Sequence, residues 1–124
     1  MPVKVIDASA VAAILFGEPD ADELVSRVQG HVLLAPMLLP VEVASVCVKK
    51  CRRHPFLRDR LLAAFGLIGQ LDITRAEVDL HAAIALAREM RLSLYDACYL
   101  WLAQRFRADL VTLDRALAHA ATKQ

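Results

Sequence analysis

Short apolar runs alternate along the chain with longer segments in which apolar residues recur every three or four positions. The runs are rich in β-branched residues, which favour strands, and the longer segments have the period of amphipathic helices. We therefore predict about seven helices around four short strands. The strands are residues 3–6, 31–35, 71–73 and 110–113, and the helices are residues 9–16, 20–29, 38–53, 55–69, 74–90, 93–106 and a short Ala-rich segment at the end.

Helices between successive strands indicate parallel crossover connections, because a tight turn cannot join two parallel strands. The pattern predicts an α/β fold, a three-layer α/β/α sandwich with a short, mostly parallel sheet of four, possibly five, strands. Local signals set the expected boundaries. Gly30 and Pro36 end elements, and Pro40 lies near a helix start. Thr74 followed by Glu77 resembles a capping box, which would begin the helix there.

The length of 124 residues and the hydrophobic content of 57% predict one compact domain, residues 1–124. Charged residues interrupt each apolar stretch before the roughly 18–20 residues needed to cross a bilayer, and no export signal precedes the first strand. We expect a cytoplasmic protein without membrane contact. Cys47, Cys51 and Cys98 are an odd number without zinc-ligand spacing, which favours neither a disulfide framework nor a zinc site.

Four acidic residues from distant parts of the chain lie in otherwise apolar sequence: Asp7, Glu42, Asp96 and Asp114. Asp7 and Asp114 follow predicted strands, and Glu42 and Asp96 lie near the starts of predicted helices. These positions meet at one edge of a parallel sheet, which is where ligands bind in such folds. A helix cap or a buried hydrogen bond explains each acid taken alone. Because acids are rarely buried without partners, all four together predict a site where a bound cation neutralises their negative charge.

Oxygen ligands without nearby His or Cys favour a hard cation, Mg²⁺ or Mn²⁺. Such a cation suits phosphate-ester chemistry, because it activates a bound water and neutralises charge at the leaving oxygen. The sequence has no glycine-rich phosphate loop of the GxxxxGK type and no GxSxG motif, which argues against nucleoside triphosphate hydrolysis and acyl transfer. The residues therefore predict metal-assisted phosphodiester hydrolysis.

The net charge of +1 gives no general indication of a nucleic-acid partner. Basic residues are nevertheless concentrated locally, and solvated helix faces are the simpler explanation of these groups. The first group is Lys49, Lys50, Arg52, Arg53, His54, Arg58 and Arg60, and the second is Arg105, Arg107 and Arg115.

Four sequence motifs surround the acids, in the order Val-Ile-Asp7-Ala-Ser9-Ala-Val, Pro36-Met-Leu-Leu-Pro-Val-Glu42-Val-Ala-Ser, Leu94-Tyr-Asp96-Ala-Cys-Tyr-Leu-Trp-Leu-Ala103 and Leu110-Val-Thr112-Leu-Asp114-Arg-Ala-Leu117. With their helical spacing, these motifs resemble those of the PIN-domain family, in particular the VapC-like toxin ribonucleases of toxin–antitoxin pairs. The resemblance covers nearly the whole chain. Many members of that family continue into a final edge strand beyond the position of Asp114. A fifth strand at that edge of the sheet is therefore a second alternative beside the four predicted strands.

The resemblance implies endonucleolytic cleavage of single-stranded RNA with Mg²⁺ or Mn²⁺, homodimerisation, and inhibition by an antitoxin. By position, Asp7, Asp96 and Asp114 resemble metal ligands, and Glu42 resembles a ligand acting directly or through water. Ser9 and Thr112 would orient the carboxylates, although ordinary turn or helix-start hydroxyls explain them equally well. An antitoxin helix would dock in a hydrophobic groove, which we expect beside residues 13–16, 21–28 and 56–68.

Aromatic residues near Asp96 suggest further contacts. Tyr95 is a candidate to stack on a base, and Arg115 is a second candidate for substrate binding, whereas Tyr99 and Trp101 are expected in the core or a dimer contact. Two other functions stay open: a non-catalytic RNA-binding protein with the PIN fold, and an aspartate-dependent phosphotransfer domain. Ser9 argues against a phosphatase of the latter kind, which has a second Asp at that position.

Overall fold

The computed structural model describes residues 2–122, and the predicted α/β fold is confirmed. In chain order, the elements are β1 (Val3–Ile6), α1 (Ala8–Leu15), α2 (Ala21–Val28), β2 (Val32–Pro36), α3 (Leu39–Arg53), the 3-10 turn η1 (Pro55–Leu57), α4 (Arg58–Phe65), the 3-10 turn η2 (Ile68–Gln70), β3 (Ile73–Ala76), α5 (Leu80–Met90), α6 (Leu94–Phe106), β4 (Asp109–Val111) and α7 (Arg115–Thr122).

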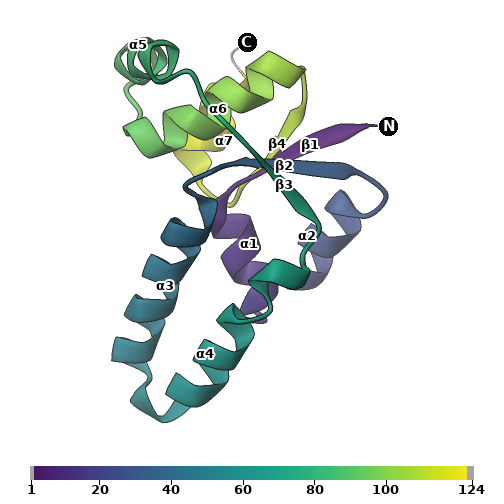
Figure 1. The fold of residues 1–124 in the computed structure, drawn as a ribbon, viewed down its shortest axis with the longest axis vertical. Coiled ribbons are helices and arrows are strands. Elements are labelled where there is room, and N and C mark those ends of the chain that lie inside the picture. The colour runs from purple at the N-terminus through teal and green to yellow at the C-terminus, as the bar shows by residue number, and fades with distance from the viewer. Residues whose placement is uncertain (1, 123–124) are drawn as a thin grey trace.

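The four strands form one parallel sheet in the order β3-β2-β1-β4. The register places Val5 of β1 beside Leu34 of β2 and Leu110 of β4. Helices cover both faces: α5, α6 and α7 lie on one side of the sheet, and α1 and α2 lie on the other (Figure 1). The predicted three-layer arrangement is therefore correct, and within residues 2–122 the sheet has four strands.

The core forms because β1 is apolar on both faces and packs against the largely apolar helix α6. Val5 and Ile6 of β1 are almost fully buried, as are Leu100 and Leu102 of α6. Burying each such side chain stabilises the fold by about 1.5–3 kcal/mol relative to leaving it in water. The packed core holds the strand ends, and the acids that follow them, in fixed positions.

The order in which strands are added to the sheet changes side between β1 and β4, although all four strands run parallel. Strands β1, β2 and β3 follow one another toward one edge, and β4 then pairs with the other side of β1. In open parallel sheets, ligands bind beyond the carboxyl ends of the strands at such a reversal. Asp7 directly follows β1 and Asp114 lies three residues beyond β4, so both acids stand at this point.

Three predicted elements differ from the structure. The helix expected from residue 74 begins instead at Leu80, where the Asp79 side chain caps it by accepting a hydrogen bond from the Ala82 N–H, 3.1 Å. Thr74 lies within β3, which extends from Ile73 to Ala76 rather than over residues 71–73. The helix expected over residues 55–69 is divided into η1, α4 and η2.

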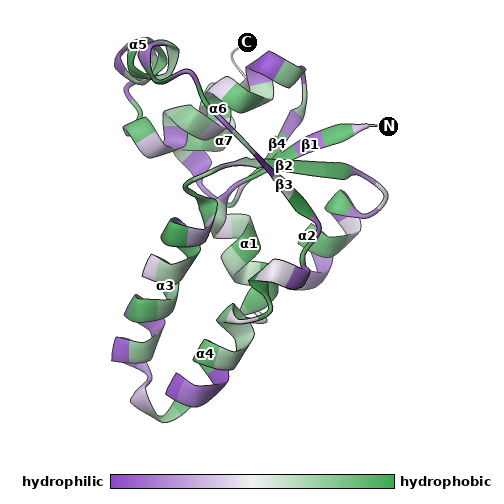
Figure 2. Cartoon of the chain, in the orientation of Figure 1, coloured by the Kyte–Doolittle hydropathy of each residue, from purple (hydrophilic) through white to green (hydrophobic). Residues whose placement is uncertain are grey.

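Helices α3 and α4 form a hairpin that projects away from the sheet (Figure 1). This hairpin combines apolar and strongly polar segments (Figure 2). Among the described residues, no helix has both the length and the apolar character needed to cross a membrane.

Candidate active site

Asp7 occupies the junction of β1 and α1 and is 4% exposed. Its extended backbone makes it the N-cap of α1, and its carboxylate accepts a hydrogen bond from the Ala10 N–H, 3.0 Å. The Ser9 hydroxyl donates to Oδ1 at 2.7 Å, and the Thr112 hydroxyl donates to Oδ2. A helix cap and two hydroxyl donors thus fix both oxygens of this buried carboxylate.

The two hydroxyl side chains join the ends of β1 and β4. The Leu113 N–H donates to Ser9 Oγ at 2.9 Å, and the Asp114 N–H donates to Thr112 Oγ1 at 3.0 Å. The Asp114 carboxylate in turn accepts from the Leu117 N–H at 2.9 Å, at the start of α7. Ser9 and Thr112 therefore lie where they orient Asp7 and position the backbone that carries Asp114.

Glu42 lies in the first turn of α3 and points toward α6. The Tyr99 hydroxyl donates to Glu42 Oε1 at 2.7 Å, across 57 residues of sequence. Sequence reasoning assigned Tyr99 to the core or a dimer contact, and its ring is indeed buried, 1% exposed. Its contact with Glu42 was missed. The available signal was its position three residues after Asp96, which places both on one face of a helix.

Asp96 lies in the first turn of α6, where its N–H donates to the capping Ser93 hydroxyl at 3.1 Å. This position turns its carboxylate toward the other acids. All four predicted acids line one cleft of about 560 Å³. The cleft also includes Ser9, Ser45, Lys49, Tyr95 and Tyr99 among its lining residues.

Burial raises the pKa of Asp7, Glu42 and Asp96 above the ordinary range of carboxyl groups. The charge of Asp114 adds to this effect at Asp7 and Asp96, and the charges of Asp96 and Asp7 add to it at Glu42. Hydrogen bonds from Thr112 and Ser9 act in the opposite direction on the pKa of Asp7. The acids are thus close enough to repel one another, and a cation in the cleft would relieve the repulsion.

The donor set fits a hydrated hard cation better than a closed cage. Within residues 2–122, no three His, Cys, Asp or Glu side chains are arranged to hold one ion among them. Mg²⁺ commonly uses only one or two carboxylates and keeps several waters. Four carboxylates that line one cleft, those of Asp7, Glu42, Asp96 and Asp114, can supply these ligands and leave room for waters.

The structure places some of the remaining candidate residues in the cleft and others outside it. Tyr95 is 59% exposed and lines the cleft, as a residue that stacks on a base would. Arg115 begins α7, is exposed, and is not among the described residues that line the cleft. Trp101 is partly buried and packs against the core. Lys49, which sequence reasoning placed only in a basic run, lines the cleft beside the acids.

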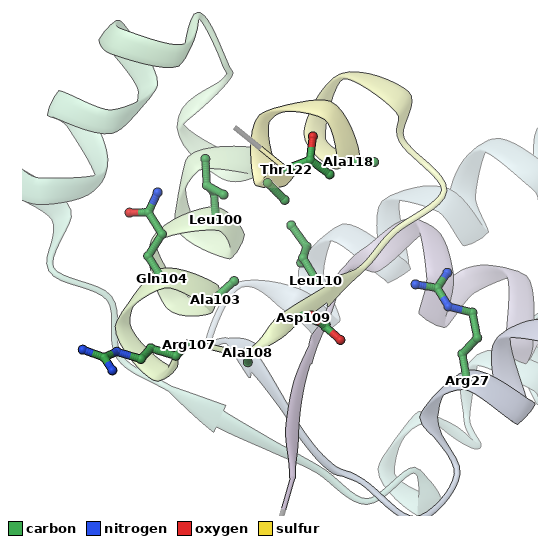
Figure 3. Close-up of a pocket in the computed structure, with 11 residues that line it drawn as sticks. Arg27, Leu100, Ala103, Gln104, Arg107, Ala108, Asp109, Leu110, Ala118 and Thr122 are labelled. Carbon is green, nitrogen blue, oxygen red and sulfur yellow. The ribbon is translucent and has the colours of Figure 1, made fainter. Parts of the chain in front are cut away.

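A larger cavity, about 710 Å³, lies at the other end of the strands, beside β4. Its floor is apolar, with Leu100 and Ala103 of α6 and Leu110 of β4, and Arg27 faces them from α2 (Figure 3). Asp109, at the amino end of β4, is its one acidic lining residue. Size alone therefore does not locate the chemistry, because the four acids converge on the smaller cleft.

The fold and the cleft define a small α/β protein with an acidic site at the reversal point of a parallel sheet. Comparison with known proteins identifies the family, because residues 4–123 match the PIN domain. The chain belongs to the PIN-domain family. It is 33% identical over 125 residues to the VapC ribonuclease Mb0985 of Mycobacterium bovis, covering 97% of this chain and 92% of that one.

Two solved structures share the fold. PAE2754 from Pyrobaculum aerophilum has a TM-score of 0.77 and 22% sequence identity, covering 96% of this chain and 84% of that one. VapC20 of Mycobacterium tuberculosis, described as a sarcin–ricin loop cleaving toxin, has a TM-score of 0.66 and 13% identity, covering 95% of this chain and 94% of that one. The resemblance drawn from the four motifs is therefore confirmed at the level of the family.

Proposed function

We propose that the protein is a Mg²⁺- or Mn²⁺-dependent endoribonuclease that hydrolyses phosphodiester bonds in single-stranded RNA. The observation that carries this proposal is the convergence of Asp7, Glu42, Asp96 and Asp114, from four separate segments, on one cleft. The similarity to a VapC ribonuclease over 97% of the chain supports RNA as the substrate. We further propose that the protein acts in the cytoplasm as the toxin of a toxin–antitoxin pair.

In this proposal, Asp7, Asp96 and Asp114 hold the metal, and Glu42 holds it directly or through water. When bound, the cation supplies an activated water and neutralises charge on the scissile phosphate. The chain's own residues keep the ligands in place. Ser9 and Thr112 fix the orientation of the Asp7 carboxylate, and the Tyr99 hydroxyl fixes that of Glu42. Such supporting contacts typically contribute 10–100-fold to metal affinity or activity.

The test is cleavage of a labelled single-stranded RNA with Mg²⁺ by the wild type, Asp96→Asn and Asp72→Asn. Asp72 is an exposed acid between η2 and β3, outside the cleft, so its variant is a matched control for loss of one charge. We expect Asp96→Asn to lower the rate by about a hundredfold or more, since supporting residues alone cost up to about that much. Asp72→Asn should retain the wild-type rate.

Equal rates for the wild type and Asp96→Asn, or a rate unaffected by EDTA, would contradict the proposal. Titration calorimetry with Mn²⁺ separates the enzyme from a binding-only protein with the same fold. An enzyme of the proposed kind shows a Mn²⁺ site that Asp7→Ala abolishes. RNA binding without cleavage and without that site would favour the binding-only function.

The antitoxin site that we propose is a hydrophobic groove between α1 and α4. The groove has a volume of about 330 Å³ and is lined by Leu15, Phe16, Gly17, Leu57, Arg60, Leu61 and Ala64. Apart from Gly17, these residues fall within two of the three segments from which the sequence predicted a groove. An amphipathic helix from the antitoxin would fill it with its apolar face.

We also propose that the protein forms a homodimer. Leu80 and Ile84 of α5 are 57% and 50% exposed and lie four residues apart, which places them on one face of the helix. A second copy of the chain would remove this apolar surface from water. Sedimentation equilibrium of the wild type and Ile84→Glu tests this, and a wild-type monomer would contradict it.

A further inference from the structure

The basic residues of the chain are gathered at the end of the α3–α4 hairpin. We call residues 49–60, from the last turns of α3 to the first turn of α4, the basic arm. This span contains six of the fifteen Lys and Arg residues and one acidic residue, so it carries +5 while the whole chain carries +1. The hydrophilic colour at the outer ends of α3 and α4 marks it (Figure 2).

Most of this charge is not neutralised within the protein. Among the described residues, ion pairs form only between Lys50 and Glu18 and between Arg58 and Asp59. Four cations of the basic arm consequently make no ion pair there: Lys49, Arg52, Arg53 and Arg60. Like charges held this close repel one another, and the charge pattern therefore fits an anionic partner.

The basic arm is continuous with the acidic cleft through α3. Glu42 and Lys49 both line the cleft, and they are seven residues apart on the same helix. Arg53 follows Lys49 by four residues, so all three lie on one stripe of α3. The helical rise places Lys49 about 10 Å and Arg53 about 16 Å from Glu42 along the axis. Cations thus lead outward from the carboxylates.

An aromatic side chain stands at the tip of the basic arm. Phe56 lies in η1 and is 102% exposed, so it contacts almost nothing in the protein. Single-stranded nucleic acids are bound by this combination, a row of cations that follows the backbone and an aromatic ring on which a base stacks. A phosphodiester strand accounts for both features, whereas an acidic peptide accounts only for the charge.

We propose that the basic arm binds the RNA strand where it leaves the acidic cleft, with Lys49 and Arg53 on successive phosphates and Phe56 stacked on a base beyond them. This proposal rests on the proposed ribonuclease function and names the substrate contacts of that same site. The basic arm would hold the strand without taking part in the chemistry. Its residues are therefore substrate-binding residues that raise affinity for the RNA.

The experiment measures RNA affinity against salt concentration in the Asp96→Asn background, where turnover is suppressed, and steady-state cleavage in the wild-type background. Each lost phosphate contact lowers the slope of log K against log salt by about 0.7 for single strands. We expect that decrease for Lys49→Gln and for Arg53→Gln, about twice that for the double variant, and a KM several-fold higher with kcat unchanged.

The matched control is Lys50→Gln, which removes the same charge one residue away on α3. Its ammonium pairs with Glu18 and lies 5.7 Å from the centre of the Phe16 ring, so it faces α1 rather than the cleft. We expect no comparable change in the salt slope for this variant. Phe56→Leu keeps an apolar side chain but removes stacking, so RNA affinity should fall about fivefold or more with the slope unchanged.

Three results would overturn the inference. Lys50→Gln matching Lys49→Gln would mean that only the total charge matters. If Lys49→Gln and Arg53→Gln bind RNA as the wild type does, and the wild type still cleaves RNA, the basic arm does not bind the strand. The proposed function would then be unaffected. Loss of self-association without loss of RNA affinity in Phe56→Leu would assign the tip to a protein contact. A wild type that neither binds nor cleaves RNA would instead reject the proposed function itself.

Discussion

At the position of Asp7, one carboxylate serves both the fold and the site. It caps α1 by accepting a hydrogen bond from the Ala10 N–H, and it also accepts hydrogen bonds from the Ser9 and Thr112 hydroxyls while it is almost fully buried. Asp114 also accepts from a backbone N–H at a helix start. Helix capping and participation in the acidic cleft are therefore compatible at these two residues.

Tyr99→Phe tests the hydroxyl that reaches Glu42. The variant keeps the buried ring and removes one hydrogen bond, so we expect about 1 kcal/mol less stability and about tenfold lower metal affinity or activity. The hydrogen bond from Tyr99 lowers the pKa of Glu42 against the effect of burial. Its loss therefore raises that pKa further, and the acid limb of kcat/KM should move to higher pH.

The measurement is the pH dependence of kcat/KM for the wild type and Tyr99→Phe, with thermal unfolding of both. A purely structural role for the hydroxyl would lower the melting temperature and leave the acid limb in place. Superimposable pH profiles would therefore contradict the assignment of Tyr99 to the site.

At the scale of elements, α3 and α4 carry contacts of different kinds on different faces. One face of α3 contributes Glu42 and Lys49 to the acidic cleft. The side of α4 that faces α1 contributes Leu61 and Ala64 to the hydrophobic groove. Because the two surfaces are separate, different substitutions should affect RNA binding and antitoxin binding.

Ala64→Glu tests the groove, with Ala63→Glu as the matched control. Ala64 lines the groove, whereas Ala63 is its exposed neighbour on α4, and both substitutions suit a helix. A charged side chain in the apolar groove should weaken binding to the proposed antitoxin by about a hundredfold, because the charge loses its hydration there. Ala63→Glu should bind normally.

Both variants should cleave RNA as the wild type does, since neither residue lines the cleft. Isothermal titration with the purified antitoxin measures the affinities. Equal affinity of Ala64→Glu and Ala63→Glu would show that the antitoxin docks elsewhere.

At the scale of the whole molecule, charge is separated between an acidic cleft and a basic arm although the net charge is only +1. The acids are held close together by the packed core, which costs stability when they are ionised. Burial first, and the charges of the neighbouring acids second, raise the pKa values of Asp7, Glu42 and Asp96. The molecule therefore folds with a built-in repulsion that protons or a cation relieve.

Thermal unfolding with and without Mg²⁺ measures that repulsion. The raised pKa values mean that the folded state binds protons more tightly, so these groups lower stability as pH rises from about 4 through the raised pKa values. Mg²⁺ binds the ionised carboxylates. At ten times its Kd we expect about 1.4 kcal/mol of stabilisation at pH 8, a few degrees in melting temperature, and little at pH 5.

The control is Asp96→Asn, which should respond less to Mg²⁺ at pH 8 and be at least as stable as the wild type without metal. The same Mg²⁺ effect at pH 5 and pH 8, or in the wild type and Asp96→Asn, would contradict a cation bound by these carboxylates.

The sequence by itself determined the kinds of elements and the parallel sheet, because periodicity and the order of strands and helices are local properties of the chain. It also placed Asp7 and Asp114 beyond strand ends and Glu42 and Asp96 at helix starts, positions that a parallel sheet brings to one edge. That is why the four acids could be selected before their cleft was known. Their metal and their roles stay predictions.

Only the tertiary structure decided the contacts between distant segments. Thr74 has the local signature of a helix cap, but pairing with Leu34 of β2 places it within a strand, and Asp79 caps the helix instead. Tyr99 reaches Glu42 across 57 residues, and Thr112 reaches Asp7 across 105. Such contacts depend on how elements pack, which the pattern of neighbouring residues does not encode. The family resemblance implied the supporting roles of Ser9 and Thr112, whereas the hydrogen bond from Tyr99 to Glu42 was found only in the fold.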